Sequence, residues 1–223
     1  MRRLSVVFVS MILFFTALPL YSQNRVQTRN AAFIVPKGLQ PRVNFWIDIF
    51  TRYGDNHEVI HHRAYPQVVF MVLDFYTAAK KMNKVALEKY KKEEIKKHVA
   101  IVEGAARRLA KGERPVSELE KTMARRMAFL GSGSKKYEDL FKNDLIRSQR
   151  GIKERYREAL ERSGLYLSHI EDIFVKEAGL PKELTRLPFV ESSFDYSVRS
   201  SVGAAGIWQF MPATARSYKM MVK

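Results

Sequence analysis

Residues Glu191–Ala215 read ESSFDYSVRSSVGAAGIWQFMPATA, and their pattern predicts the order of the elements around them. Within this stretch, Gly203 and Gly206 bracket two alanines, and such a side-chain-poor segment lets the backbone approach a ligand closely. Ile207–Met211 then alternates enough to predict a short strand, and Pro212 suits the first turn of a helix. The expected order is a helix that ends in a carboxyl, a small-residue turn, a short strand and a second helix.

The helix before this turn carries a single carboxyl. Gly179 followed by Pro181 predicts that one helix stops and another starts. The new helix should direct three apolar side chains inward, those of Leu184, Leu187 and Val190. It ends at Glu191, and a carboxyl among apolar neighbours loses hydration, which raises its pKa toward the range that a general acid needs. An exposed glutamate at a helix end is the alternative interpretation.

These residues carry a family resemblance. The segment Glu191–Ala215 resembles the signature of the lytic transglycosylases, lysozyme-fold enzymes that cleave bacterial peptidoglycan, with its glutamate, serine, glycines, glutamine, methionine, proline and threonine in place. Residues 42–75 and 156–194 also resemble a membrane-bound branch of that family. The resemblance therefore covers most of the chain that follows the leader and is strongest at its C-terminal end.

The resemblance implies that Glu191 is the only catalytic acid and base. In this family the glutamate protonates the oxygen between N-acetylmuramic acid and N-acetylglucosamine, and the substrate's own acetamido group stabilises the cationic centre. The same glutamate then deprotonates the C6 hydroxyl, which leaves a 1,6-anhydro end. Such a substrate-assisted route needs no second carboxylate. Asp195 matches a turn position of the family, so a structural role is expected for it.

The resemblance also implies a substrate-binding set, which comprises Ser200, Gln209, Met211, Gly203 and Gly206. Ser200 matches a serine that contacts the sugar or the glutamate, while Gln209 and Met211 match positions beside the cleaved bond. Core packing is an equal expectation for Met211, since apolar side chains at regular spacing are usually core. No cofactor and no metal are implied.

A different motif, HEVIHH at His57–His62, contains the H-E-x-x-H pattern of zinc proteases. Two histidines four apart can share a metal on a helix, where they stand about 6 Å apart along the axis, but not on a strand, where the separation is roughly 13 Å. The turn-like TRYGDN before the motif and the β-branched run Val68–Leu73 after it predict two strands around a turn. We therefore expect surface histidines on a hairpin, with a zinc protease as the alternative.

Composition limits the partners. The chain has 223 residues, a net charge of +16, 46% hydrophobic residues and no cysteine, so disulfides, thiolate metal sites and a lipidated cysteine are excluded. The basic charge suits an anionic partner. Peptidoglycan glycan strands are the expected partner, export argues against nucleic acid, and cell-envelope proteins and membrane association stay open. Arg199 either pairs locally or faces the peptide carboxylates of the wall polymer.

Four regions are expected along the chain. Residues 1–22, with a basic start and an apolar run to Leu20, predict a signal peptide and hence export to the periplasm or cell envelope, with an uncleaved anchor as the alternative. Residues 23–75 form an N-terminal α/β region with the hairpin and an amphipathic helix around Val43–Phe50. Residues 76–163 form a basic helical region, and residues 164–223 the N-terminal part of a lysozyme-like domain. The expected fold class is mainly α (α+β).

Two helical stretches are expected inside the basic region. Residues 76–126 predict two or three long helices that break near Gly112 and Pro115. After a GSGS loop at residues 131–134, one helix is expected over residues 137–163, terminated by Gly164.

The functional hypotheses follow from these regions. Catalytic domains of the family continue beyond the position of Ala215 with a further segment that faces the glutamate, so we expect a C-terminally truncated domain whose activity is open. The leading hypothesis is a peptidoglycan-cleaving lytic transglycosylase. The alternative is a non-catalytic peptidoglycan-binding or scaffold protein of the cell envelope.

Overall fold

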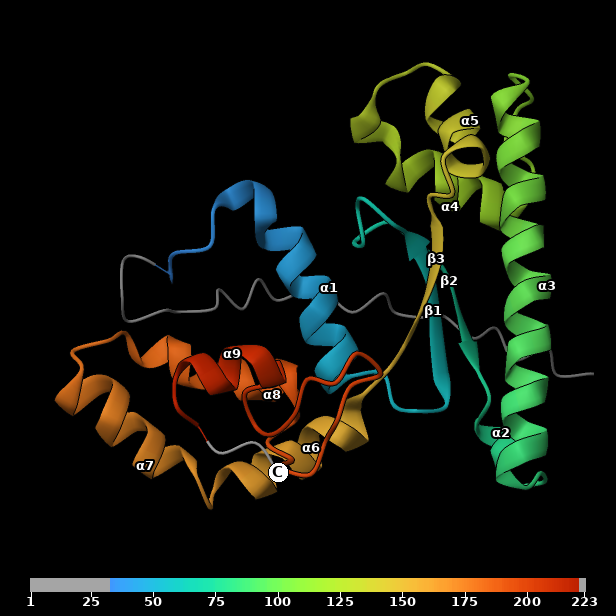
Figure 1. Cartoon of the computed structure of the whole chain (residues 1–223). Coiled ribbons are helices and arrows are strands. Elements are labelled where there is room, and N and C mark those ends of the chain that lie inside the picture. The colour runs from blue at the N-terminus through green and yellow to red at the C-terminus, as the bar shows by residue number, and fades with distance from the viewer. Residues whose placement is uncertain (1–32, 221–223) are drawn as a thin grey trace, which may run out of the picture.

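The computed structural model describes residues 33–220, so the predicted signal peptide at residues 1–22 lies outside the described residues. The architecture is mainly α with a small antiparallel sheet, which confirms the expected fold class (Figure 1). The α-helices and strands are α1 Gln40–Thr51, β1 His57–His62, β2 Val69–Asp74, α2 Tyr76–Ala79, α3 Lys84–Ala110, α4 Glu118–Arg126, α5 Lys135–Lys142, β3 Ile146–Arg150, α6 Lys153–Ser163, α7 Leu167–Glu171, α8 Leu187–Glu191 and α9 Pro212–Ser217.

The sheet has three strands in the order β2-β1-β3, and both pairings are antiparallel. The predicted hairpin is confirmed as β1 and β2, in which Val59 pairs with Val72. The single helix predicted over residues 137–163 is wrong, because β3 divides it and pairs Gln149 with Val59. The break begins after α5, where Asp144 adopts a left-handed φ of 48° that a helix cannot continue.

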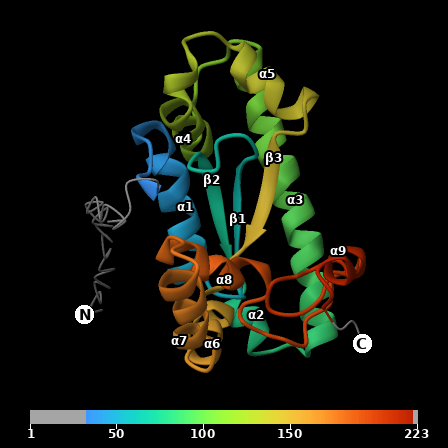
Figure 2. The ribbon, with the colours of Figure 1, turned by 60° about the vertical axis from the view of Figure 1, so that its left-hand side comes forward.

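Both faces of β1 are covered. Ile60 faces a large core built with side chains of α3, α4 and α5, whereas Val59 faces a smaller core with Phe45 and Ile49 of α1. Figures 1 and 2 show α3 and α1 on opposite sides of the sheet. Successive strand residues point to opposite faces, so the apolar run of this middle strand is buried on both sides.

The histidines of the HEVIHH motif are mostly buried, so the expectation of surface histidines is wrong for two of them. His61 is 5% exposed and packs on Phe45 of α1 with ring centroids 4.7 Å apart, and His62 is 2% exposed and packs on Tyr65 with ring centroids 5.1 Å apart. The Nδ1 of His62 accepts hydrogen bonds from the backbone N–H groups of Ala64 (3.0 Å) and Tyr65 (3.2 Å). Burial, with the charge of His61, lowers the pKa of His62 to about 4, so this ring is neutral at pH 7.

The alternative of a zinc protease requires the motif on a helix, and the motif lies on the strand β1. Among residues 33–220, no group of three or more His, Cys, Asp or Glu side chains is arranged to hold a metal ion. Within the same range, no helix combines the length and the apolar character that crossing a bilayer requires.

The break predicted near Gly112 and Pro115 is confirmed between α3 and α4. Gly112 adopts a φ of 81°, which an L side chain rarely does. The next helix starts with a capping box, in which the Ser117 side chain accepts from the N–H of Glu120 and the Glu120 carboxylate accepts from the N–H of Ser117. The long helix α3 packs on the sheet through Val102, Ala105, Ala106 and Leu109.

The helix α6 connects the sheet to the C-terminal elements, which lie together at one end of the sheet (Figure 2). Its start is fixed by backbone hydrogen bonds from Ile152 N to Ile49 O and from Lys153 N to Tyr53 O, both 3.0 Å long. Gly151 allows this approach, since a Cβ there would lie 2.3 Å from the Tyr53 backbone. α6 ends at Ser163 with Gly164 as its C-cap, as expected. The boundaries of the four predicted regions stay a prediction.

Candidate active site

The helix α8 presents Glu191 as its last residue. The predicted stop and restart before it is confirmed, since Gly179 has a left-handed φ of 63° and a 3-10 turn begins after Pro181. The carboxylate of Glu171 in α7 forms ion pairs with Lys182 (2.9 Å) and Arg186 (2.7 Å), and their hydrogen bonds lower the pKa of Glu171. These pairs hold the start of α8 against α7.

The inward orientation predicted for the apolar residues of this helix is wrong for two of three. Leu187 is 47% exposed and Val190 is 73% exposed. A helix of one to two turns buries only a narrow face, and here Pro188 occupies it.

The Glu191 side chain is exposed, so the apolar burial expected for it is wrong. The apolar neighbour that was expected to desolvate it, Phe194, is fully buried and packs on Phe189 with ring centroids 4.6 Å apart. The chain turns sharply after α8, so Phe194 enters the interior while the carboxylate stays in solvent. Glu191 is therefore accessible to a large ligand.

The turn after Glu191 is strained and firmly held. Ser193 and Phe194 both adopt left-handed φ values, 57° and 56°, which cost roughly 1–2 kcal/mol each for residues with a Cβ. Two arginines of α6 stabilise this conformation: Arg155 Nε donates to Ser193 Oγ (2.9 Å) and Arg162 Nε donates to Ser193 O (3.0 Å). The N-terminal part of the chain thus fixes the backbone next to Glu191.

The predicted short strand over Ile207–Met211 is wrong. These residues lie in a turn closed by an isolated antiparallel bridge between Ala205 and Phe210. Gly206 and Gln209 have left-handed φ values of 77° and 50°, which a strand does not allow. The helix predicted to begin at Pro212 is confirmed as α9.

Two of the predicted substrate-binding side chains hold this loop together. Gln209 Nε2 donates to the carbonyl oxygens of Gly206 (2.9 Å) and Val198 (3.2 Å), and Ser200 Oγ accepts from Ala204 N (2.9 Å). Their contacts with substrate stay a prediction.

The buried Ser192, next to Glu191, donates its hydroxyl to Ile207 O at 2.8 Å. This hydrogen bond is the direct link between the helix end at Glu191 and the loop that contains Gln209.

The remaining predicted residues, Gly203, Gly206, Met211 and Asp195, have different structural roles. Gly203 has a φ of 90° and, like Gly206, no heavy atom within 4 Å of an added Cβ, so backbone conformation rather than crowding requires both glycines. Met211 is 42% exposed, which does not fit core packing. Asp195 Oδ1 accepts from Ser197 N (2.9 Å) and Ser197 Oγ (2.6 Å), which is the expected turn role and which lowers the pKa of Asp195.

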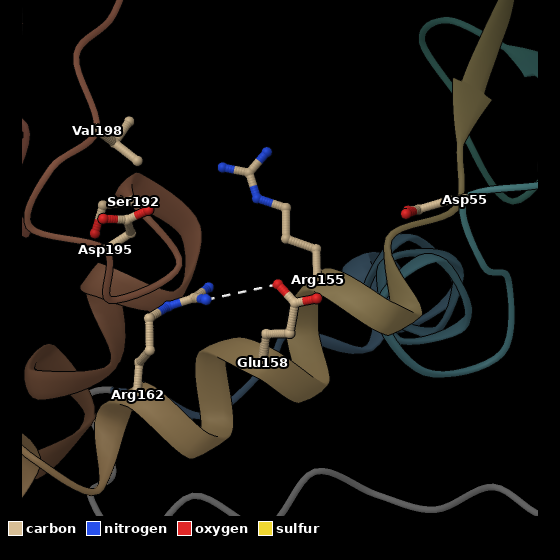
Figure 3. A pocket seen from close by; sticks show the side chains of 7 residues that line it. All are labelled: Asp55, Arg155, Glu158, Arg162, Ser192, Asp195 and Val198. Carbon is tan, nitrogen blue, oxygen red and sulfur yellow. Dashed lines mark ion pairs between the residues drawn. The ribbon is translucent and has the colours of Figure 1, made fainter. Parts of the chain in front are cut away.

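An open pocket of about 320 Å³ lies between α6 and the loop after Glu191 (Figure 3). Its lining residues are Asp55, Arg155, Glu158, Arg162, Ser192, Asp195 and Val198. The three residues of α6 in this lining were not among the predicted site residues. Their spacing, i, i+3 and i+7, places them on one helix face and was the signal available for finding them.

Comparison with known proteins matches the last quarter of the chain. The family model of the transglycosylase SLT domain matches residues 170–223. The chain is similar to membrane-bound lytic murein transglycosylase D of Escherichia coli, strains K12 and O6:H1, with 52% identity over 44 residues, 20% of this chain and 10% of each relative. It is also similar to a putative tributyltin chloride resistance protein of Alteromonas sp. (strain M-1), with 40% identity over 48 residues, 22% of this chain and 23% of the relative.

The matched stretch spans about one-tenth of the length of the Escherichia coli relatives. No solved structure matches the chain. The SLT match includes Glu191 and the whole turn and loop that follow it. The C-terminal segment, residues 170–223, is therefore similar to the SLT domain of the lytic transglycosylases.

Proposed function

We propose that the chain is part of a lytic transglycosylase that cleaves the MurNAc–GlcNAc bond of peptidoglycan and leaves 1,6-anhydro-MurNAc ends. The observation that carries the proposal is the position of Glu191. It lies in the segment that matches the SLT domain, at an exposed helix end, directly before a turn that two arginines and a buried phenylalanine hold in place. A fixed backbone next to an accessible carboxyl is the arrangement that acid–base catalysis on a large polymer needs.

In the proposed reaction Glu191 first donates its proton to the glycosidic oxygen. A bound glycan strand would cover this exposed carboxyl and exclude water from it. The acetamido group of the substrate stabilises the cationic sugar, and the Glu191 carboxylate then takes the proton of the C6 hydroxyl, whose oxygen closes the anhydro ring. One carboxyl is sufficient in this route, which fits the turn role of Asp195.

The proposed substrate-binding residues have different roles around that carboxyl. The exposed Met211 offers an apolar surface to a sugar ring. Ser200 and Gln209 shape the loop, and because Ser200 Oγ is an acceptor within the loop, its own proton is available to a sugar oxygen. Gly203 and Gly206 keep the loop surface free of side chains.

We further propose that the protein acts in the bacterial envelope. Residues 1–22 have the composition of a signal peptide, and the Escherichia coli relatives are named as membrane-bound murein enzymes. A chain without cysteine has no thiol for lipid attachment, so any membrane association uses another route.

The test is mass spectrometry of purified peptidoglycan after incubation with the chain that lacks residues 1–22. Anhydro-ended fragments are expected from the parent and none from Glu191→Gln. The matched control is Glu177→Gln, which removes another exposed carboxylate of the same segment and should cleave like the parent. Fragments with reducing ends would identify a hydrolase, and equal cleavage by parent and Glu191→Gln would refute the assignment of the acid.

The exposure of Glu191 favours one second candidate, a peptidoglycan-binding or scaffold protein that does not cleave. In that case the parent should sediment with insoluble peptidoglycan and release no fragments, and Glu191→Gln should sediment equally. The same incubation therefore separates the two candidates.

A further inference from the structure

The pocket in Figure 3 contains charged groups that the proposed cleavage does not use. Its walls are the loop after α1, one face of α6, and the loop from Ser192 to Val198. Its volume of about 320 Å³ is near the lower end of small-molecule sites, roughly 300–1,000 Å³. Ser192 both lines the pocket and directly follows Glu191, so the pocket adjoins the candidate active site.

Three of the five charged side chains in the pocket already have partners inside the protein. Glu158 forms an ion pair with Arg162 at 3.5 Å, and the Arg162 Nε donates to Ser193 O. Asp195 accepts two hydrogen bonds from Ser197. Glu158, Arg162 and Asp195 therefore already have charged or hydrogen-bonding partners within the protein.

One cation and one anion remain. Arg155 uses only its Nε, toward Ser193, and Figure 3 shows its guanidinium extending from α6 into the space between the loop and Asp55. Asp55 forms none of the ion pairs found among residues 33–220, although its backbone N–H donates to Glu154. Burial, together with the carboxylates of Glu154 and Glu158, raises the pKa of the Asp55 carboxyl, whereas the charges of Lys91 and Arg150 lower it. A cation placed beside Asp55 would be attracted by these three carboxylates.

We propose that this pocket binds a short peptide group with one free carboxylate and one free ammonium. The carboxylate binds the guanidinium of Arg155, and the ammonium binds the carboxylate of Asp55. A guanidinium binds a carboxylate through two parallel hydrogen bonds, and a carboxylate is the natural partner of an ammonium.

The inference rests on the proposed peptidoglycan substrate, whose muramic acid units carry peptides next to the bond that Glu191 would cleave. The pocket therefore recognises the peptide part of a glycan unit whose sugar lies at Glu191.

Three peptides of nearly equal size test the charge requirement by isothermal titration calorimetry. Nα-acetyl-Lys-D-Ala carries one ammonium and one carboxylate. Its Nε-acetyl derivative lacks the ammonium, and its C-terminal amide lacks the carboxylate. We expect the doubly charged peptide to bind about ten-fold more tightly than either derivative, because each loses one charge-assisted contact.

Variants assign each charge to its partner. Asp55→Asn should lower the affinity for the doubly charged peptide to that of the Nε-acetyl derivative, whose own binding it should not change. Arg155→Met should lower the affinity for the doubly charged peptide to that of the C-terminal amide, whose own binding it should not change. The matched control is Arg157→Met, which removes an exposed arginine of α6 that does not line the pocket. Since Arg155 also holds Ser193, Asp55→Asn keeps the test valid if Arg155→Met fails to fold.

Equal binding of the three peptides, no binding at millimolar concentration, or an equal loss in Arg157→Met would each overturn the proposal. Glu191→Gln should bind the peptide like the parent. If the chain prefers the doubly charged peptide but releases no glycan fragments, the peptide-binding proposal stands and the proposed catalysis is refuted. If the chain releases anhydro-ended fragments but binds the three peptides equally, the catalysis stands and the peptide-binding proposal is refuted.

Discussion

Two regions of the molecule are stabilised by different interactions. The sheet unit comprises residues 40–150, that is, the sheet and the helices α1 to α5, and the C-terminal unit comprises residues 164–220. The sheet unit buries a continuous apolar core that includes Ile60, Val102 and Met123. Among the described residues of the C-terminal unit, Phe194 and Pro188 are fully buried, while Leu187 and Val190 are exposed. Here ion pairs and hydrogen bonds such as those of Glu171, Ser192 and Ser193 fix the chain.

This difference has an energetic consequence. Burying an aliphatic side chain contributes about 1.5–3 kcal/mol, whereas a hydrogen bond contributes about 0.5–1.5 kcal/mol net. The sheet unit should therefore dominate global stability, and the C-terminal unit should open locally at a lower free energy. The candidate active site lies in the less stable part and depends on α6 for its rigidity.

The largest effect is expected in the core of the sheet unit. Ile60→Ala leaves a cavity at a fully buried position of the middle strand and should lower the free energy of unfolding by about 3–4 kcal/mol in urea titration. Val72→Ala, on the edge strand and partly exposed, is the control and should lose less than about 1 kcal/mol. Equal losses for the two would contradict the burial pattern.

The second-largest effect is expected from acid, which should lower the free energy of unfolding of the sheet unit. The pKa of His62 is lowered to about 4 in the folded chain from about 6.5 when unfolded, so the unfolded chain takes up the proton first. Stability is therefore fully present above pH 6.5 and falls by up to about 3 kcal/mol as the pH drops from 6.5 to 4. Urea titrations across this range measure the loss.

His62→Asn keeps an acceptor for the N–H groups of Ala64 and Tyr65 but does not titrate. Its stability should change less between pH 6.5 and 4 than that of the parent. An equally steep acid loss in this variant would assign the pH dependence to other groups.

A smaller and local effect is expected for Ser192→Ala. The change leaves the partly buried Ile207 carbonyl without the Ser192 donor, which costs about 1–2 kcal/mol. Hydrogen exchange should become faster in residues 198–210 and stay unchanged in the strands β1 and β3. Faster exchange in both units would show that they open together.

The smallest effect is expected for Leu187→Ala in the C-terminal unit. This side chain is largely exposed, so its truncation should change the free energy of unfolding by less than about 0.5 kcal/mol. A loss comparable to that of Ile60→Ala would show that the C-terminal unit has an apolar core after all.

Local features and the likeness to the SLT domain could be read from the amino-acid sequence. The hairpin, the helix stop at Gly112 and the restart after Gly179 all follow from residues that are close together in the sequence. The SLT signature is equally local, since its residues keep a fixed spacing from Glu191 to Ala215.

Burial depends on contacts that form only in the folded chain. α1 covers one face of β1, so His61 packs on Phe45 and is buried, whereas a hairpin alone would leave it exposed. In the same way, the left-handed turn at Ser193 directs Phe194 inward and leaves Glu191 in solvent, and α6 brings Arg155 to that turn. Burial and charge pairing depend on contacts between distant segments, which local propensity and spacing do not specify.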